Sequence, residues 1–542
     1  MGNFRVPVPE NEPVLNYAPG SAERAHLEQA LSMLKKSQIE VPMVIGGKEV
    51  TTSEKVKMTA PHDHNHVLGH YNKGGKSEVE AAIKAALDAK PAWENMPAEE
   101  RAAIFLKAAD LIAGPYRYEF NAASMLGHSK NIFQAEIDAV CELVDFFRFN
   151  VYYAEEIYDM QPENPASGGA IWNRIEYRPL EGFVFAVTPF NFVSIAGNLP
   201  TAPALMGNTV VWKPASSVVY TAHFIMQILK EAGLPDGVIN MITARGSDVG
   251  ELILKNENLA GIHFTGSTDT FHTMWRTVGE NIKNYKSYPR IVGETGGKDF
   301  VFVHNSASVK QTATAITRGS FEYQGQKCSA VSRVYAPRSI WNEIKKLMIE
   351  HAKDMKMGDP SDLSNFINAI IDKPAFESII EYIEYAKKSK DAEIIFGGGY
   401  DDSKGFFIEP TLVVTTDPHY KLIEEEIFGP VVTVYVYDDS DYEKTLELCN
   451  TTSPYALTGA IFAVDRDAVV EATRVLRHAA GNFYINDKPT GAVVGQQPFG
   501  GGRASGTNDK AGSLLNLIRW TSPRTIKENF LPPEDYKYPF LG

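Results

Sequence analysis

Phe183-Val184-Phe185-Ala186-Val187-Thr188 is a short run of apolar, β-prone residues between Gly182 and Pro189. Comparable runs follow at residues 209–212, 238–242 and 262–264, and helical patterns separate them at residues 194–206, 221–232 and 247–255. Strands that alternate with helices predict a parallel sheet with right-handed crossovers. Because ligands of such sheets bind beyond the carboxyl ends of the strands, we expect functional side chains directly after these runs.

A second alternating series begins near residue 299, with apolar runs at residues 300–304, 331–336, 431–436 and 460–464, and it predicts a second α/β domain. Ahead of the first series, helical patterns cover residues 97–112 and 134–149, and Ser77 with Glu80 indicates the capping box of an earlier helix. Residues 170–177 are typical of an exposed strand, and a strand-like pattern returns after residue 516. The first 75 residues are rich in turns and predict no definite element.

The composition limits the classes of function. The chain has 542 residues with 53 basic and 67 acidic side chains, a net charge of -14, which argues against a nucleic-acid or anionic membrane surface. The sequence contains no run of about 18 apolar residues, so no membrane span is expected. These features favour a protein that handles small molecules.

The cysteines and the start of the chain bear on the compartment. Cys141, Cys328 and Cys449 are widely spaced, which predicts no disulfide framework and indicates a reducing compartment. Residues 1–13 have neither the apolar stretch of a secretory signal nor the Arg-rich, acid-poor pattern of a transit peptide. We therefore expect a cytoplasmic protein.

Cys328 is the candidate nucleophile. It follows Gln324-Gly325-Gln326-Lys327, a polar segment that indicates a loop or helix start, where a neighbouring cation would lower the thiol pKa. The alternative is a small buried hydrophobic residue. Cys141 and Cys449 lie in apolar helical patterns, so for them burial is the expected role.

Two further polar residues stand near the ends of apolar runs. Glu294, in Gly293-Glu294-Thr295-Gly296, is a candidate general base, and the alternative is a solvated loop residue. Asn191 comes directly after the run at residues 183–188, where its amide is a candidate donor to an oxyanion or a plain turn residue.

The cofactor signals are individually weak. No Gly-x-Gly-x-x-Gly follows a predicted strand. Lys213 follows one strand and could bond ribose hydroxyls, while Gly266 and Ser267 follow another and could open a helix toward a phosphate. Glu426 and Phe428, before Gly429-Pro430, are equally consistent with a plain turn.

His62, His64 and His66 alternate in the sequence, with His70 nearby. Without a supporting cluster of cysteines or carboxylates, we interpret them as part of a solvated loop rather than a metal site, and we expect no metal.

Taken together, these segments resemble the aldehyde dehydrogenase superfamily. The resemblance covers residues 79–527 and rests on motifs in the family's order: Pro189-Phe190-Asn191, Lys213-Pro214, Phe264-Thr265-Gly266-Ser267, Glu294-Thr295-Gly296-Gly297-Lys298, Gly325-Gln326-Lys327-Cys328 and Glu426-Ile427-Phe428-Gly429-Pro430. It implies that Cys328 attacks an aldehyde, that Asn191 and the Cys328 N–H hold the oxyanion, and that Glu294 activates water. The implied cofactor is NAD, with contacts from Thr188, Lys213, Ser216, Gly246, Gly266, Ser267, Glu426 and Phe428.

A closer resemblance is to the branch that oxidises glutamate semialdehyde, the open form of pyrroline-5-carboxylate. It rests on residues 321–330, 482–488, 490–501 and 503–508. It implies an anchor loop in which Gly491 and Ala492, together with Ser329, bind the substrate carboxylate, while Phe192 and Phe499 enclose the aliphatic stem.

Two positions depart from the common family pattern. Many members have a glutamate three residues after the ribose-binding lysine, whereas this chain has Ser216, so the electrostatic reason for rejecting NADP is missing and NADP is the alternative cofactor. Ala492 has no hydroxyl, which leaves only its backbone N–H for a substrate contact.

The resemblance also implies a domain division. We expect a helical part of the NAD-binding domain at residues 1–168, an oligomerisation strand at 169–181 and a Rossmann-like core at 182–296. A catalytic domain with Cys328 follows at 297–480, a return to the NAD-binding domain at 481–515, and a C-terminal oligomerisation strand with its tail at 516–542.

The resemblance also implies a homodimer or larger homo-oligomer and a transient contact with proline dehydrogenase. If the source is eukaryotic, it implies a location in the mitochondrial matrix. Two alternative functions stay open: a dehydrogenase for another small semialdehyde such as succinate semialdehyde, and a non-catalytic binding protein on the same scaffold. A comparison of kcat/KM for glutamate semialdehyde and succinate semialdehyde distinguishes the first alternative from the leading hypothesis. Thiol labelling distinguishes the second, because a structural Cys328 should be no more reactive than Cys141 or Cys449.

Overall fold

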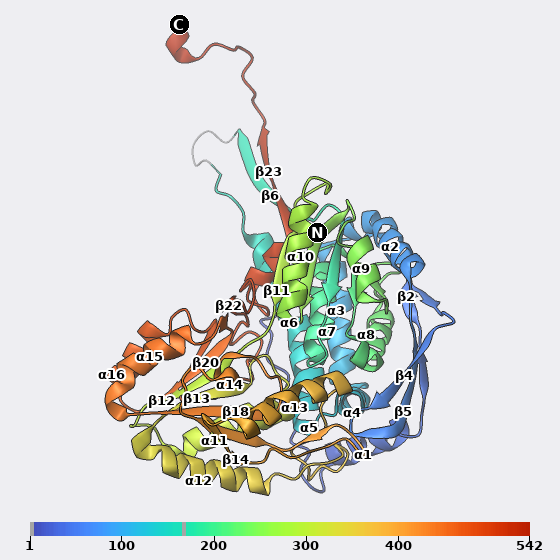
Figure 1. Cartoon of the computed structure of the whole chain (residues 1–542). Helices are drawn as coiled ribbons and strands as arrows, with labels where there is room; N and C mark the ends of the chain where they lie inside the picture. Colours follow the sequence, from blue (N-terminus) through green and yellow to red (C-terminus); the bar gives the residue numbers. More distant parts are fainter. Residues whose placement is uncertain (1–4, 165–169) are drawn as a thin grey trace.

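The computed structural model describes residues 5–164 and 170–542, and within them two large sheets organise the chain (Figure 1). The first has the strand order β11-β10-β7-β8-β9-β2-β3. Its strands are β2 (Met43–Ile45), β3 (Lys48–Val50), β7 (Phe183–Val187), β8 (Thr209–Lys213), β9 (Ile239–Met241), β10 (Leu259–Thr265) and β11 (Arg290–Glu294). Strands β7 to β11 pair in parallel, which confirms the predicted parallel sheet.

The apolar runs of this sheet are continuous because both faces are covered. Val184 and Trp212 pack into one hydrophobic cluster and Phe185 and Val211 into another, and all four are fully buried. Strands with two buried faces need apolar side chains at successive positions.

The edge strands β2 and β3 were not predicted. They form an antiparallel hairpin around Gly46 and Gly47, whose φ angles of 57° and 74° suit the tight turn, and β2 continues the sheet antiparallel to β9. The expected helical segment at residues 1–168 therefore also supplies strands to the first sheet. The Gly-Gly pair was the available sequence signal.

Helices cover the first sheet and fill the N-terminal region. They are α1 (Ala22–Leu34), α2 (Lys76–Glu94), α3 (Ala98–Ala113), α4 (Arg117–His128), α5 (Ile132–Ala135), the π-helix η1 (Glu136–Glu142), α6 (Leu143–Asp159), α7 (Val193–Leu205), η2 (Ser216–Val218), α8 (Val219–Ala232), α9 (Gly246–Leu252) and α10 (Thr268–Glu280). The predicted capping box was wrong by two residues, because Gly75 is the N-cap of α2 and Glu78 accepts from its N–H at 2.7 Å. Helix α1, capped by Ser21, was missed.

The second sheet has the order β14-β17-β18-β13-β12-β20-β21. Its strands are β12 (Asp299–Val303), β13 (Val331–Pro337), β14 (Ala392–Phe396), β17 (Thr411–Thr415), β18 (Val431–Tyr437), β20 (Thr458–Phe462) and β21 (Asn482–Ile485). The predicted runs of this series are β12, β13, β18 and β20. Strand β21 pairs in parallel with β20, so the expected return to the first domain at residue 481 comes too early.

The remaining elements are the helices that follow β12 in the chain and the minor strands. The helices are α11 (Val309–Phe321), η3 (Glu322–Gly325), α12 (Arg338–Asp354), α13 (Lys373–Lys388), α14 (Lys421–Glu424), η4 (Asp439–Asp441), α15 (Tyr442–Thr451), α16 (Arg466–Val475), α17 (Leu514–Leu517), η5 (Ile518–Trp520) and η6 (Pro539–Leu541). The minor strands are β1 (Ile39–Val41), β4 (Lys55–Ala60), β5 (Asp63–Asn72), β15 (Tyr400–Asp401), β16 (Phe407–Ile408), β19 (Tyr455–Ala456) and β22 (Gly502–Arg503).

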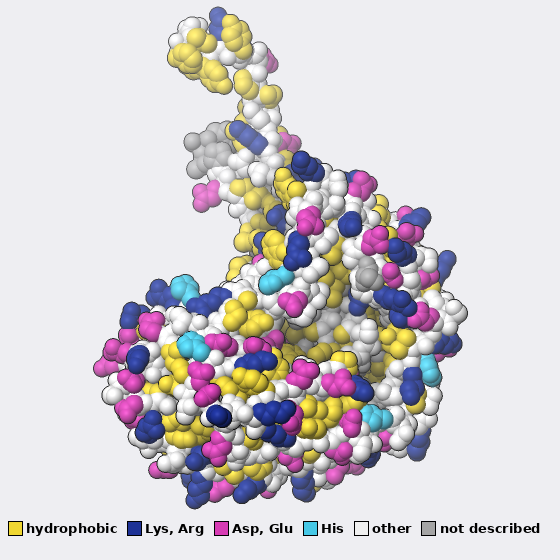
Figure 2. Space-filling view, viewed as in Figure 1, with side chains coloured by type: hydrophobic (Ala, Val, Ile, Leu, Met, Phe, Trp, Pro, Cys, Tyr) yellow, Lys and Arg dark blue, Asp and Glu magenta, His cyan; other side chains and the backbone are white. Residues whose placement is uncertain are grey.

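A two-stranded ribbon projects from the body of the molecule (Figure 1). It pairs β6 (Ile171–Pro179) antiparallel with β23 (Thr521–Asn529), the two strand-like segments noted in the sequence; residue 169, the first of the expected oligomerisation element, lies outside the described residues. The chain then continues as a tail, and its end is largely yellow, the colour of hydrophobic side chains, in Figure 2. The exposed large hydrophobic residues after β23 are Phe530, Leu531, Tyr536, Tyr538, Phe540 and Leu541.

The alternating histidines join the two halves of the molecule. His62 is buried at the turn between β4 and β5, which corrects the expected solvated loop, and His64 Nε2 lies 3.0 Å from the carbonyl oxygen of Asp402. The His64 ring also contacts Phe406, with centroids 4.5 Å apart. In the described part of the chain no group of three or more His, Cys, Asp or Glu residues is arranged to hold a metal ion.

Over residues 5–164 and 170–542, no helix combines the length and the apolar character that crossing a bilayer requires.

The contact between the β4–β5 turn and residues 404–406 generates a stability prediction. A Cβ at Gly405 would lie 2.5 Å from the backbone of His62, so Gly405→Ala should destabilise the protein by about 1–3 kcal/mol through forced separation of this contact. Gly279→Ala in α10, where a Cβ meets nothing within 4 Å, is the matched control and should be neutral or stabilising. Thermal unfolding of both variants measures the difference; equal midpoints would contradict the close contact.

Candidate active site

Two cavities meet at Cys328. One, of about 610 Å³, opens beyond the strands of the first sheet, and the other, of about 100 Å³, lies toward residues 488–499. Cys328 lines both and is 7% exposed. Cys141 and Cys449 are also buried, as expected, but line neither of these cavities.

The larger of these two cavities receives side chains from the carboxyl ends of β7 and β8. Thr188 and Asn191 follow β7 and line it, and Lys213 is the last residue of β8. The Thr188 hydroxyl accepts from Trp212 Nε1 at 3.0 Å, and the Thr188 N–H donates to the Lys213 carbonyl at 3.2 Å. These two bonds connect the ends of β7 and β8, and residues that follow the strands line the cavity, as predicted.

Helices α9 and α10 open on the same cavity. Gly246 begins α9, Gly266 follows β10, and Ser267 caps α10 by accepting from the Thr270 N–H at 3.3 Å. The N-terminus of a thirteen-residue helix beside a half-buried lysine suits an anionic group such as a pyrophosphate. Ser216 is exposed in η2 and does not line this cavity, so the structure does not bring it together with the other predicted cofactor residues.

Glu426 and Phe428 reach the cavity from the second sheet, just before β18. Glu426 Oε1 accepts from the Gly297 N–H at 2.8 Å, and burial raises the pKa of this carboxyl to about 7. Phe428 has a left-handed backbone with φ 59°, and its ring contacts Phe190 edge-on with centroids 5.6 Å apart. Strain at a non-glycine residue is typical of functional loops.

Cys328 lies in a turn between η3 and β13, not at a helix start. The Lys327 ammonium donates to Glu322 Oε2 at 3.1 Å, so this cation is paired with a carboxylate. The pKa of the Cys328 thiol is raised well above its usual value by burial first, and then by the charges of Asp299, Glu426 and Glu294. The expected lowering of the thiol pKa by Lys327 was therefore wrong for the unliganded protein.

Glu294 ends β11 and lines the smaller cavity with Cys328. Its Oε2 accepts from the Gly501 N–H at 3.2 Å. Burial raises the pKa of the Glu294 carboxyl well above its usual value, which suits a group that must take up a proton near neutral pH.

The residues predicted to bind the substrate line the smaller cavity. They are Phe192, Ser329, Gly491, Ala492 and Phe499. The Ser329 and Thr490 hydroxyls are 2.8 Å apart, and Gly491 has φ +91°, a conformation that favours glycine.

Several residues of this cavity were missed from the sequence. Glu142 lines it, and its Oε2 accepts from the Ser194 hydroxyl at 3.0 Å. Burial raises the pKa of Glu142 to about 8. Lys488 and Thr490 line it as well. Glu142 is one of two glutamates in the apolar helical pattern at residues 134–149, and the pattern alone does not distinguish it from Glu136.

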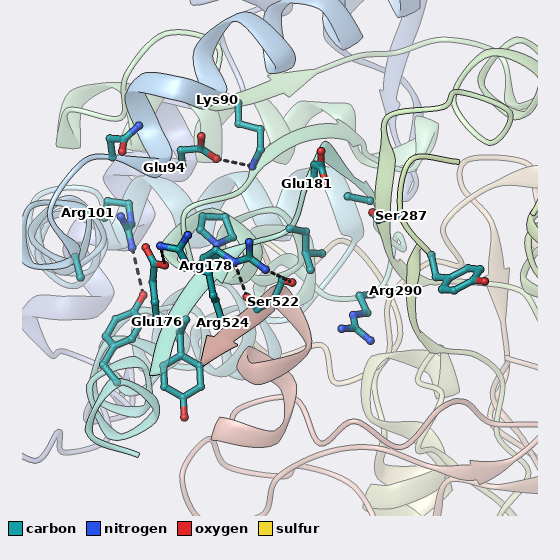
Figure 3. Close-up of a pocket in the computed structure, with 18 residues that line it drawn as sticks. Lys90, Glu94, Arg101, Glu176, Arg178, Glu181, Ser287, Arg290, Ser522 and Arg524 are labelled. Carbon is teal, nitrogen blue, oxygen red and sulfur yellow. Dashed lines mark hydrogen bonds and ion pairs between the residues drawn. The ribbon is translucent and has the colours of Figure 1, made fainter. Parts of the chain in front are cut away.

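A larger cavity, of about 890 Å³, lies away from Cys328, beside the base of β6 and β23 (Figure 3). Its labelled side chains form local pairs, such as Arg178 with the Ser522 carbonyl at 3.1 Å and Lys90 with Glu94 at 3.3 Å. Cys328, Glu294 and Asn191 do not line it, so the chemistry belongs to the two cavities described above.

The raised pKa of Cys328 gives a pH prediction. Alkylation by iodoacetamide requires the thiolate, so its rate on the unliganded protein should rise about tenfold per pH unit from pH 7 to 9. Mass spectrometry should find the label on Cys328 before Cys141 or Cys449. A rate that levels off below pH 8, or equal labelling of all three, would contradict this geometry.

Known proteins share this sequence and architecture. A model of the aldehyde dehydrogenase family matches residues 49–526. The mitochondrial delta-1-pyrroline-5-carboxylate dehydrogenase of Dictyostelium discoideum is 53% identical over 99% of this chain and 96% of its own length. The crystal structure of the Mycobacterium tuberculosis delta-pyrroline-5-carboxylate dehydrogenase bound with NAD is 53% identical, with a TM-score of 0.96, and the match covers 100% of this chain and 99% of that one. Proline utilization A from Bdellovibrio bacteriovorus is 30% identical with a TM-score of 0.91, over 97% of this chain and 54% of its own. The chain therefore belongs to the aldehyde dehydrogenase family.

Proposed function

We propose that this chain oxidises L-glutamate γ-semialdehyde, the open form of delta-1-pyrroline-5-carboxylate, to L-glutamate with NAD. The observation that carries the proposal is the position of Cys328, whose side chain lines both a cavity of cofactor size and a small cavity with donors and aromatic walls. The names of the relatives at 53% identity give the same substrate.

The smaller cavity suits this substrate. Ser329 and the backbone N–H groups of Gly491 and Ala492 bind the α-carboxylate, while Phe192 and Phe499 pack against the aliphatic stem. Glu142 faces the α-ammonium, which favours the ionised form of its carboxyl. Succinate semialdehyde has no ammonium for Glu142, so it is the poorer candidate.

Cys328 as thiolate forms a bond to the aldehyde carbon and gives a thiohemiacetal. The Asn191 amide and the Cys328 N–H donate to its oxyanion. NAD held in the cavity of about 610 Å³ would supply the acceptor for the hydride that leaves the thiohemiacetal carbon, and Cys328 would then hold the acyl group as a thioester. Glu294 then takes a proton from water, which attacks the thioester carbon, releases glutamate and restores the thiol.

The cavity of about 610 Å³ has the groups that NAD requires. Lys213 binds the adenosine ribose, Ser267 and Gly266 at the start of α10 bind the pyrophosphate, and Glu426 with Phe428 holds the nicotinamide ribose and ring. Thr188 and Gly246 complete the lining. Because Ser216 places no negative charge beside the ribose, discrimination against NADP is weak.

The assembly and the compartment form a further part of the proposal. A two-stranded ribbon such as β6–β23 is marginally stable alone, and the tail beyond it exposes six large hydrophobic side chains, which favours a homodimer or larger homo-oligomer. The likeness to proline utilization A favours a transient contact with proline dehydrogenase. We place the enzyme in the cytoplasm, or in the mitochondrial matrix if its source is eukaryotic.

Replacing the nucleophile tests the function. Cys328→Ala should lower NADH formation from pyrroline-5-carboxylate by more than about 1000-fold, because no other group replaces the thiol. Cys449→Ala, another buried cysteine, is the control and should keep its activity. Circular dichroism checks the fold, and parallel assays with NADP measure cofactor preference. Undiminished turnover by Cys328→Ala would refute the mechanism.

Oligomerisation is tested by light scattering at micromolar concentration, where the chain of 59.9 kDa should have at least twice the monomer mass. Removing residues 530–542 should weaken the assembly, because this segment carries the exposed apolar side chains. A monomeric mass for the full chain would contradict the proposed interface.

A further inference from the structure

A cluster of three charged side chains lies between the nucleophile turn and the anchor loop. Glu322 Oε2 accepts from Lys327 Nζ at 3.1 Å and from Lys488 Nζ at 3.5 Å. The Glu322 and Lys327 side chains are each 5% exposed, and that of Lys488 is 23% exposed. All three line the smaller cavity beside Cys328.

Two cations share one carboxylate in this cluster. Although burial raises the pKa of Glu322, Lys327 and Lys488 together hold it below its usual value, so the carboxylate is ionised. With both ammonium groups protonated the cluster has an excess of one positive charge, although burial lowers the pKa of Lys327. The pKa values of Glu142 and Glu294 are raised by burial, which limits how far these carboxyls offset that charge at neutral pH.

Asp138, which also lines the smaller cavity, is paired elsewhere. Its carboxylate contacts the buried Lys130 ammonium and accepts from the Val193 and Ser194 N–H groups at 2.9 Å each. It therefore does not neutralise the cluster at Glu322.

Lys488 is the member of the cluster that touches the anchor loop. Its Nζ donates to the Thr490 carbonyl at 2.9 Å, and a Cβ built on Gly491 would lie 2.9 Å from the same Nζ. Thr490 in turn contacts Ser329. An ammonium has three donors, and two of those on Lys488 have partners among the described residues, which leaves one for a ligand in the cavity.

We propose that Lys488 is the specificity-determining cation of the substrate cavity and selects aldehydes that carry a carboxylate over uncharged aldehydes of the same length. This inference rests on the proposed function. Backbone N–H and hydroxyl groups bind neutral and charged oxygen acceptors alike, whereas a cation in a poorly solvated cavity favours the charged one. Lys327 is nearly fully buried against Glu322, whereas Lys488 contacts the Thr490 carbonyl. Lys488 is therefore the cation of the cluster that touches the anchor loop.

Lys488→Met tests the assignment, with NAD in excess and two substrates: pyrroline-5-carboxylate and the uncharged aldehyde pentanal. The ratio of kcat/KM for pyrroline-5-carboxylate over pentanal should fall about 10- to 100-fold, mainly through KM for pyrroline-5-carboxylate. Raising the ionic strength should increase this KM in the wild type and change it less in the variant. Lys488→Arg retains the charge and should recover most of the ratio.

A purely structural role for Lys488 would lower kcat/KM for both aldehydes equally, and that result would overturn the inference. If Lys488→Met does not fold, Lys488→Gln, which keeps a donor toward Thr490, takes its place with the same required change in ratio. A wild-type protein that fails to oxidise pyrroline-5-carboxylate would refute the proposed function itself. A wild type that is active on it, with an unchanged ratio in the neutral variants, would refute only the role of Lys488.

Discussion

The close approach of Gly325 to the Gly429 carbonyl sets the geometry on which the active site depends. A Cβ at Gly325 would lie 2.2 Å from that oxygen, so only glycine allows the two loops to meet. Tyr323 and Gln324 precede it with φ angles of 51° and 56°, a conformation that costs roughly 1–3 kcal/mol at each non-glycine residue. Burial of Tyr323 and two hydrogen bonds from the Gln324 amide, to the Ser129 and Ala369 carbonyls, hold the strained turn in place.

The two large sheets contribute to the site from opposite ends of their strands. The first sheet supplies Asn191, Lys213 and Glu294 from the carboxyl ends of β7, β8 and β11, as is usual for parallel sheets. The second sheet supplies Cys328 and Glu426 from segments that come just before β13 and β18. The cavity of about 610 Å³ therefore lies between the two sheets, and the smaller cavity extends from the same thiol.

Burial is the dominant electrostatic influence at this junction. It raises the pKa values of Cys328, Glu294 and Glu426, so that a thiol and two carboxyls lie close together without the full repulsion of ionised groups. The cluster around Glu322 shows the opposite balance, because two ammonium groups hold its carboxylate ionised. The site thus combines reactive groups whose ionisation burial disfavours with a neighbouring carboxylate whose ionisation two ammonium groups favour.

The sequence by itself determined the parallel strands and the residues that follow them, because apolar periodicity and strand ends are local properties. The ordered motifs likewise predicted Cys328, Glu294 and Asn191 as catalytic residues, and these residues line the two cavities that meet at the thiol. Only the tertiary structure decided that Lys327 pairs with Glu322, that Ser216 lies outside the cavity of about 610 Å³, and that Glu142 and Lys488 line the cavity of about 100 Å³. It also decided that β2 and β3 extend the first sheet and that β21 belongs to the second. Apart from the Lys327–Glu322 pair, these outcomes depend on residues distant in the sequence. They also depend on how completely each group is removed from water, which no local pattern records.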